Sequence, residues 1–177
     1  MNIGKKFEKD FSDSIPEYVL VHRLPDSAQA FGNNSGLRFS NKSPFDFLLW
    51  DSRRRVLYAL EMKSVSGKTI SFERSKEDNG VIHFHQIEGL NRYNKYEGVV
   101  CGFVINFRAI ETTIFIYIDS FNKLIELVNK KSVSYNDIIE NKIQYIVIPQ
   151  TIKRTRYTYD VESLLSNSNF IGKEDKE

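Results

Sequence analysis

Cysteine is nearly absent from this sequence, and its scarcity excludes two kinds of stabilised fold. Cys101 is the only cysteine among 177 residues, so neither an intrachain disulfide framework nor a zinc site made of cysteines can form. It lies within the apolar run GVVCGFVINF, which favours a buried, inert thiol. Histidine does not compensate, because only His22 is left to join His83 and His85 as a zinc ligand.

Long apolar runs and a dominant charge are missing as well. No segment approaches the roughly 18 apolar residues that span a bilayer, and the N-terminal MNIGKKFEKDF has no secretory signal core. Lysine and arginine number 25 against 23 aspartate and glutamate, which excludes a histone-like polycation. We therefore expect a protein of the reducing cytoplasm, and its overall charge says little about its partners.

The chain does have enough apolar material for one compact core. Hydrophobic residues make up 41% and aromatic residues 13% of the sequence, and a chain of this length is too short for two large domains. It contains no internal repeat, low-complexity tract or dividing linker. We predict a single domain over residues 1–166, followed by a polar, flexible tail at 167–177.

The order of predicted helices and strands indicates an α/β fold built around one sheet. Residues 25–44 form a polar stretch without periodicity, and a loop of that length inside a compact domain is usually functional or disordered. Helices are predicted over 2–14, over 83–96 and from 120, and strands over 18–24, 46–50, 56–63, 69–72, 98–107, 112–118 and 144–148.

The stretch LYALEMKS, residues 57–64, ends an apolar strand with an acid and a base. Side chains at positions i and i+2 of a strand share one face, so Glu61 and Lys63 project together while Met62 faces away. An E-x-K tripeptide is common by chance, so its functional significance depends on which residue lies opposite Glu61 on the neighbouring strand.

The hairpin that precedes Glu61 brings a second acid to the same place. If the chain turns through 51–56, Trp50 pairs with Leu57, and Asp46 falls opposite Glu61. A five-residue loop would shift this pairing by one position, but both acids stay at the same end of the hairpin. Two facing carboxylates repel each other, and a hard divalent cation is the usual resolution.

These residues are suited to metal-assisted hydrolysis. Asp46, Glu61 and the backbone carbonyl of Met62 would supply the few oxygen ligands that Mg²⁺ accepts while it keeps water and substrate oxygens. Lys63 beside such an ion can position and polarise an attacking water, or neutralise the charge of a phosphorane-like transition state. The pattern indicates hydrolysis of a phosphodiester.

Four short motifs follow one another in a familiar order: Gly4, Phe7 and Glu8; PFDF at 44–47; LEMK at 60–63; and His85 with Gln86. This set resembles the PD-(D/E)xK nuclease superfamily, and its spacing resembles the RecU family of Holliday junction resolvases, including compact phage-type members. The resemblance implies a restriction-endonuclease-like fold, with a central mixed β-sheet flanked by helices. It also implies a homodimeric enzyme that depends on Mg²⁺, for which Mn²⁺ can substitute. The implied location is the cytoplasm of a bacterial or phage-infected cell. Such enzymes make paired symmetric nicks in four-way DNA junctions during recombination and repair.

The resemblance gives each motif residue a role. Asp46 and Glu61 match the metal ligands, and Lys63 matches the catalytic lysine. Glu8 matches an acid that completes or braces the metal site, and Gln86 matches an amide that holds a ligand or the backbone in place.

The polar stretch at 25–44 falls where RecU proteins carry a stalk that enters the junction centre. Here it is shorter and less basic than in that family. The aromatic-rich strands at 98–118, or the helices that flank them, are a candidate dimer interface, and a core role is the favoured alternative for each of their aromatic residues taken singly. The predicted DNA contacts are Arg23, Arg38, Lys42, Lys5 and Lys68.

Two other functions stay open on the same residues. A PD-(D/E)xK endonuclease of restriction or repair type would cut ordinary duplex DNA with the same site. A non-catalytic nucleic-acid-binding protein on this fold would not need Asp46, Glu61 and Lys63, so their presence argues against it.

Overall fold

The computed structural model describes residues 2–25 and 43–168 of the chain. Most of the predicted loop at 25–44 and of the tail at 167–177 therefore lies outside the described residues. None of the described helices is long and apolar enough to span a bilayer. The elements are, in chain order, α1 (Ile3–Ser12), β1 (Val19–Arg23), β2 (Phe47–Asp51), β3 (Val56–Val65), β4 (Thr69–Ser71), α2 (Phe84–Tyr93), β5 (Val99–Phe107), η1 (Arg108–Ile110), β6 (Thr112–Tyr117), α3 (Ile118–Leu127), β7 (Ser132–Ser134), α4 (Tyr135–Glu140), β8 (Tyr145–Val147), β9 (Gln150–Lys153), β10 (Arg156–Tyr159) and α5 (Val161–Asn167).

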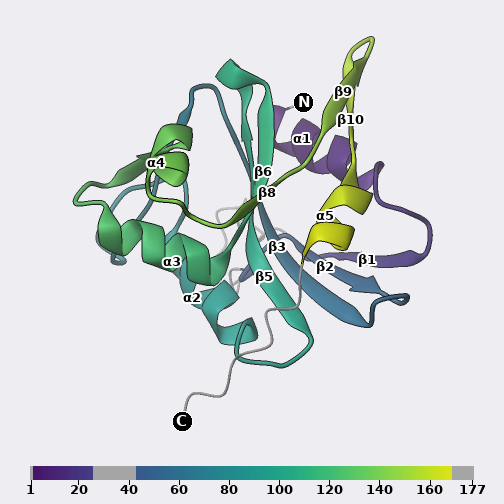
Figure 1. Ribbon diagram of the computed structural model, residues 1–177, viewed down its shortest axis with the longest axis horizontal. Helices are drawn as coiled ribbons and strands as arrows, with labels where there is room; N and C mark the ends of the chain where they lie inside the picture. Colours follow the sequence, from purple (N-terminus) through teal and green to yellow (C-terminus); the bar gives the residue numbers. More distant parts are fainter. Residues whose placement is uncertain (1, 26–42, 169–177) are drawn as a thin grey trace, which may run out of the picture.

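The centre of the fold is a six-stranded sheet in the order β1-β2-β3-β5-β6-β8. The sheet is mixed, because β3 and β5 run parallel and the other neighbouring pairs run antiparallel. Figure 1 shows α2, α3 and α4 on one face and α1, α5 and the β9–β10 hairpin on the other. The predicted fold class, an α/β fold with a central mixed sheet flanked by helices, is confirmed.

β3 and β5 occupy the middle of the sheet because both of their faces are apolar. Ala59 and Phe103 belong to the core on the α2 and α3 side, whereas Leu60 and Val104 belong to the core on the α1 and α5 side. A strand covered on both faces reads as a continuous apolar run, as VLYAL and VVCGFVINF do. By the same alternation, Glu61 extends the face of Ala59 toward α2.

The β2–β3 hairpin has the predicted register. Trp50 pairs with Leu57, as expected for a turn through 51–56, and the antiparallel ladder ends at the pair of Phe47 with Leu60. The residue before Phe47 and the residue after Leu60 are the two predicted metal ligands. The hairpin therefore brings these acids to one place.

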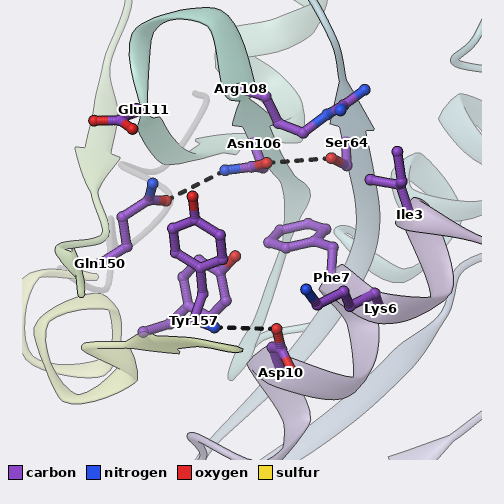
Figure 2. A pocket seen from close by; sticks show the side chains of 11 residues that line it. Ile3, Lys6, Phe7, Asp10, Ser64, Asn106, Arg108, Glu111, Gln150 and Tyr157 are labelled. Carbon is purple, nitrogen blue, oxygen red and sulfur yellow. Dashed lines mark hydrogen bonds between the residues drawn. The ribbon is translucent and has the colours of Figure 1, made fainter. Parts of the chain in front are cut away.

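Several elements in the last third of the chain were not predicted: β7, α4, the β9–β10 hairpin and α5. β7 pairs with β4 in a small separate sheet, so the strand predicted at 69–72 exists but lies outside the central sheet. The β9–β10 hairpin docks on α1, where the Tyr157 N–H donates to Asp10 Oδ2 at 3.1 Å (Figure 2). These short elements depend on tertiary contacts of this kind.

The aromatic strands β5 and β6 do not offer an exposed surface. Phe103, Phe107 and Phe115 are fully buried, and Tyr117 is 9% exposed. They form core on both faces of the sheet. The core role is therefore confirmed for these four residues, and they do not form a dimer interface. An interface on the flanking helices stays a prediction.

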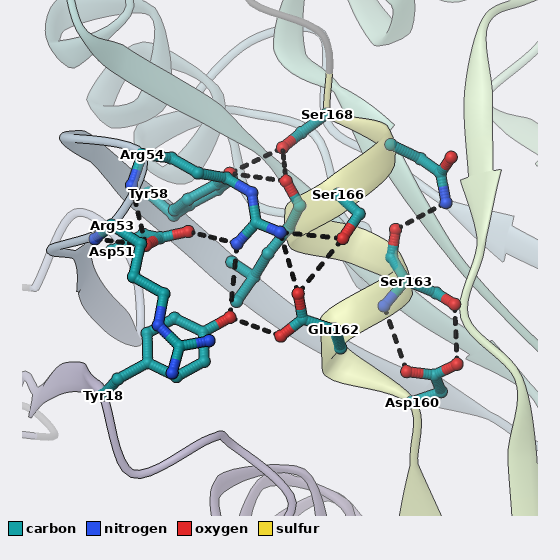
Figure 3. A network of polar contacts seen from close by, with 12 residues as sticks. Tyr18, Asp51, Arg53, Arg54, Tyr58, Asp160, Glu162, Ser163, Ser166 and Ser168 are labelled. Carbon is teal, nitrogen blue, oxygen red and sulfur yellow. Dashed lines mark hydrogen bonds and ion pairs between the residues drawn. The ribbon is translucent and has the colours of Figure 1, made fainter.

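Arg54, in the turn between β2 and β3, fixes this hairpin to α5 (Figure 3). Its guanidinium donates to Asp51 Oδ2 at 2.8 Å and to Glu162 Oε1 at 2.8 Å, and Glu162 lies 108 positions after Arg54. It also donates to the Tyr18 hydroxyl at 3.2 Å. The Asp51 side chain is fully buried and accepts the backbone N–H groups of Arg53 and Arg54. The turn that sets the register is thus held by a buried carboxylate.

We expect Asp51→Ala to lower the free energy of unfolding by about 2–4 kcal/mol, because it leaves two backbone N–H groups without an acceptor and removes the buried partner of the Arg54 guanidinium. Glu162→Ala is the matched control on the same arginine. The Glu162 side chain is 48% exposed, so its loss should cost less than about 1 kcal/mol. Urea denaturation of both variants measures the difference, and equal losses would contradict the importance of burial.

Candidate active site

Asp46 is fixed by backbone contacts immediately before β2. Its N–H donates to the Leu60 carbonyl at 3.0 Å, and its carbonyl accepts the Leu24 N–H at 2.8 Å. These bonds hold Asp46 between β1 and β3, one residue beyond the last ladder pair. The side chain turns toward β3, where Oδ2 accepts the Met62 N–H at 2.8 Å.

The backbone of Met62 faces Asp46 because β3 continues past the last ladder pair. Successive residues of a strand direct their N–H and C=O groups to alternate sides. The Leu57 N–H bonds to the Gly98 carbonyl on the β5 side, whereas Leu60 and Met62 bond to Asp46 on the β2 side. The Met62 carbonyl therefore points to the side on which Asp46 lies, as the predicted ligand set requires.

Glu61 is 2% exposed and is held by two side chains. Its Oε1 accepts the Lys63 ammonium at 2.9 Å and also the Gln86 amide Nε2–H. Lys63 is itself only 13% exposed, so little water surrounds this ion pair. The prediction that the acid and the base of the E-x-K tripeptide share a face is confirmed, and Gln86 joins them from α2.

Gln86 ties the first turn of α2 to the site. Its Oε1 accepts the His83 N–H at 2.9 Å while its Nε2 donates to Glu61. Glu73 holds the same helix end, because it pairs with His83 Nδ1 at 2.7 Å and accepts the Phe84 N–H at 2.8 Å. Sequence reasoning missed Glu73 and this use of His83. The only available signal was the capping-box spacing of His83 and Gln86.

Burial makes the two acids difficult to ionise. It raises the pKa of Glu61 to about 8, against the attraction of Lys63, and repulsion from Asp46 adds to the rise. Burial also raises the pKa of Asp46 to about 6, against the hydrogen bond from Met62, and the charge of Glu8 adds to that rise. The fold therefore holds these acids together at a cost that a nearby cation would relieve.

The donor set fits a hard divalent cation. Each carboxylate gives one oxygen to the protein, Asp46 Oδ2 and Glu61 Oε1. The other oxygen of each accepts no hydrogen bond from the described residues. Mg²⁺ binds oxygen donors of this kind, together with a carbonyl such as that of Met62. Within 2–25 and 43–168 no group of three or more Asp, Glu, His or Cys is placed to hold a metal ion. Water and substrate oxygens would therefore have to complete the shell.

Glu8 projects from α1 and pairs with Arg23. Its Oε2 lies 2.8 Å from Arg23 Nη2 and 3.2 Å from Arg23 Nε. Its charge also raises the pKa values of Asp46 and Glu61, so it contributes to the field of the site. Its role in completing or bracing a metal site stays a prediction.

The predicted DNA contacts that the structure describes fall in two places. Lys5 is exposed on α1, and with Arg23 it helps to line a pocket of about 350 Å³ beside that helix. Lys68 is exposed in the turn between β3 and β4. Arg38 and Lys42 lie outside the described residues.

The proteins that this chain is similar to include one matched by sequence and one matched by structure. No family model matches the chain. It is 26% identical, over 177 aligned positions, to the SPbeta prophage-derived uncharacterized protein YotM of Bacillus subtilis (strain 168), and the match covers 92% of this chain and 85% of that protein. Among solved structures it resembles Hjc, a Holliday junction resolvase of the archaeal hyperthermophile Archaeoglobus fulgidus. That match has 14% identity and a TM-score of 0.44, and it covers 76% of this chain and 90% of the other. A structural likeness of this degree does not establish an activity, so the chemistry of the site rests on its own geometry.

The raised pKa of Glu61 predicts how the stability of the metal-free protein depends on pH. The pKa is about 8 in the folded protein against 4.5 for an unperturbed glutamate, so the unfolded state loses its proton first as the pH rises. The free energy of unfolding should therefore fall between about pH 4.5 and pH 8, by an amount on the order of a few kcal/mol.

Glu61→Gln should flatten this pH dependence, whereas Glu126→Gln, at an exposed position of α3, should leave it unchanged. Urea denaturation in the presence of a chelator, repeated across the pH range, provides the measurement. A slope that is the same in Glu61→Gln and in the unaltered protein would contradict the assignment.

Proposed function

We propose that this protein is a divalent-metal-dependent DNA endonuclease that resolves four-way junctions by paired nicks in recombination and repair. The observation that carries the proposal is the meeting of Asp46 and Glu61, both with raised pKa values, beside Lys63. In a purely structural ion-pair network each buried acid would have its own cation. Here both acids experience the charge of Lys63, and Arg23, which also acts on Asp46, is already paired with Glu8. The group therefore keeps a negative charge for a bound cation to balance.

The residues of the candidate active site would have separate roles in phosphodiester hydrolysis. Asp46, Glu61 and the Met62 carbonyl would hold Mg²⁺, and the ion would supply Lewis-acid charge at the scissile phosphate. Lys63 offers a positive charge on the same face, where it stabilises negative charge that develops on phosphate oxygens. Gln86 keeps Glu61 in place, so the carboxylate does not have to reorder when the substrate arrives.

Four-way junctions are the proposed substrate because the order of motifs resembles that of RecU resolvases. The prophage origin of the similar Bacillus subtilis protein supports a phage-type enzyme. A junction has approximate two-fold symmetry, and a chain with one site cuts one strand at a time. A homodimer would therefore present two equivalent sites to the two strands that must be nicked.

Cleavage of matched substrates tests the proposal. Labelled four-way junction, linear duplex of the same sequence and single strand are incubated with the protein and Mg²⁺, or with Mn²⁺. We expect symmetric nicks in the junction and little cutting of the others. Equal cutting of linear duplex would favour an endonuclease of restriction or repair type, and DNA binding without any cutting would favour a non-catalytic protein.

Substitutions of the acids should separate cleavage from binding. Asp46→Asn keeps an oxygen that can accept the Met62 N–H, and Glu61→Gln keeps one for Gln86, so both variants should fold. We expect cleavage to fall below detection while junction affinity stays within a few-fold, because binding rests chiefly on phosphate contacts elsewhere. Gel-shift and nicking assays on the same preparations give both quantities.

The control for these variants is Glu126→Gln, which should cut at the normal rate. Parallel loss of binding and cutting in Asp46→Asn and Glu61→Gln would mean that the two acids are structural.

Lys63→Met should slow the chemical step by roughly 10²- to 10³-fold, as loss of one transition-state electrostatic group commonly does.

A further inference from the structure

A second polar cavity lies on the opposite face of β3 from Glu61 and Lys63. It has a volume of about 350 Å³ and is bounded by α1, the ends of β3 and β5, the following η1 turn and the β9–β10 hairpin (Figure 2). Ser64, the residue after Lys63, lines it, and neighbouring residues of a strand point to opposite faces. The cavity and the acid site therefore share one end of β3. A cavity of this size is at the small end of the range for small-molecule sites, roughly 300–1,000 Å³.

One wall of this cavity is a network of neutral polar groups. Asn106 is opposite Ser64 in the β3–β5 register. Its Oδ1 accepts the Ser64 hydroxyl at 3.1 Å, and its Nδ2 donates to Thr113 Oγ1 at 2.8 Å and to Gln150 Oε1 at 3.2 Å. The Gln150 Oε1 thus takes part in the network, whereas its Nε2 donates to none of the described residues. That amide group remains a hydrogen-bond donor for a ligand.

The facing wall is aromatic. Phe7 and Tyr159 meet edge to face at 5.4 Å between ring centroids, and both are buried. Tyr157 stacks beside Tyr159 at 6.3 Å and is half-buried. The cavity therefore combines a ring surface with hydrogen-bonding amides. A nucleobase, which has a flat π face and a polar edge, matches both walls.

Two cations lie at the rim. Lys6 reaches from α1 to the carbonyl of Thr155 in the β9–β10 turn, so it closes one side of the mouth. The Arg108 side chain is exposed, and it forms no hydrogen bond or ion pair with the described residues. Asp10 and Glu111 also line the cavity, and their charges balance the two cations. One phosphodiester suits this rim better than a polyphosphate.

We propose that this cavity binds one unstacked nucleotide of the DNA substrate. Its base would lie against Tyr157 and the Asn106–Gln150 amides, and its phosphate would lie at Arg108. The identification of DNA as the source rests on the proposed endonuclease function. Removing a base from the stack costs a few kcal/mol, and it costs least where stacking is already interrupted, as at a branch point. A site of this kind would favour branched over linear substrates.

Fluorescence of 2-aminopurine locates such a nucleotide without relying on cleavage. Four-way junctions that each carry one 2-aminopurine, at successive positions of one strand, are bound to the Asp46→Asn protein in the presence of a chelator. We expect a fluorescence change confined to one position or to two adjacent positions. Gln150→Leu, added to the same protein, should abolish that change.

Arg108→Ala should weaken junction affinity by about three- to tenfold and reduce the salt dependence by about one phosphate contact. Lys123→Ala removes one exposed positive charge from α3 and serves as the matched control, with no change in the fluorescence pattern. Circular dichroism and thermal melts check that each variant is folded. A fluorescence pattern that Gln150→Leu and Arg108→Ala leave unchanged would overturn the proposal.

A second arm separates DNA from a free nucleotide. Deoxynucleoside monophosphates are titrated into the same proteins and followed by nuclear magnetic resonance. Binding of monophosphate that depends on Gln150 and Arg108, without any position-specific signal in DNA, would overturn DNA as the source. If the unaltered protein cuts no DNA but the position-specific signal is present, the endonuclease proposal fails and the nucleotide site stands.

Discussion

The hydrogen bond from the Met62 N–H to Asp46 Oδ2 is the contact on which the site depends. The ladder between β2 and β3 ends at Phe47 and Leu60, while β3 continues to Val65. Beyond that point the Asp46 carboxylate, rather than a backbone carbonyl of β2, accepts the Met62 N–H. Without this acceptor, an unsatisfied buried N–H would cost about 1–3 kcal/mol. The side chain that would bind a cation is therefore also the one that ends the hairpin.

The remaining contacts hold charged side chains on an apolar face of the sheet, where burial alone would disfavour them. Glu61 continues a face of β3 that is apolar at Ala59, and it is retained there by Lys63 on one side and Gln86 on the other. Gln86 in turn depends on the start of α2, which Glu73 fixes. Functional sites commonly hold charged groups in positions that lower stability, and the rest of the fold supplies the compensation. Here the large apolar cores on both faces of the sheet have that role.

The sequence predicts the centre of this arrangement well because local patterns determine it. The alternation of β3 places Glu61 and Lys63 on one face, and the length of the turn sets the pairing of Trp50 with Leu57. The pattern could not reveal how deeply Glu61 is buried, because burial depends on α2, which follows 23 residues later. Glu73 was missed for the same reason.

Other features could not be predicted because they arise only when distant segments meet. The β9–β10 hairpin has its place through Asp10 on α1, and α5 has its place through Arg54 in the β2–β3 turn. The aromatic side chains of β5 and β6 are more numerous than one face of a small sheet needs to bury. Two cores, one on each face, account for them. The second cavity likewise joins residues from six separate elements.

Binding of a divalent ion in the absence of DNA tests the central claim most directly. Mg²⁺ is titrated calorimetrically into the unaltered protein and into Asp46→Asn, Glu61→Gln and Glu126→Gln at about pH 9. This pH lies above the pKa of about 8 of Glu61 and that of about 6 of Asp46, so both acids are mostly ionised. The account predicts a saturable binding event in the unaltered protein and in Glu126→Gln that is lost or strongly weakened in the other two variants. Equal binding by all four proteins, or no binding by any of them, would contradict the assignment of Asp46 and Glu61 as a cation site.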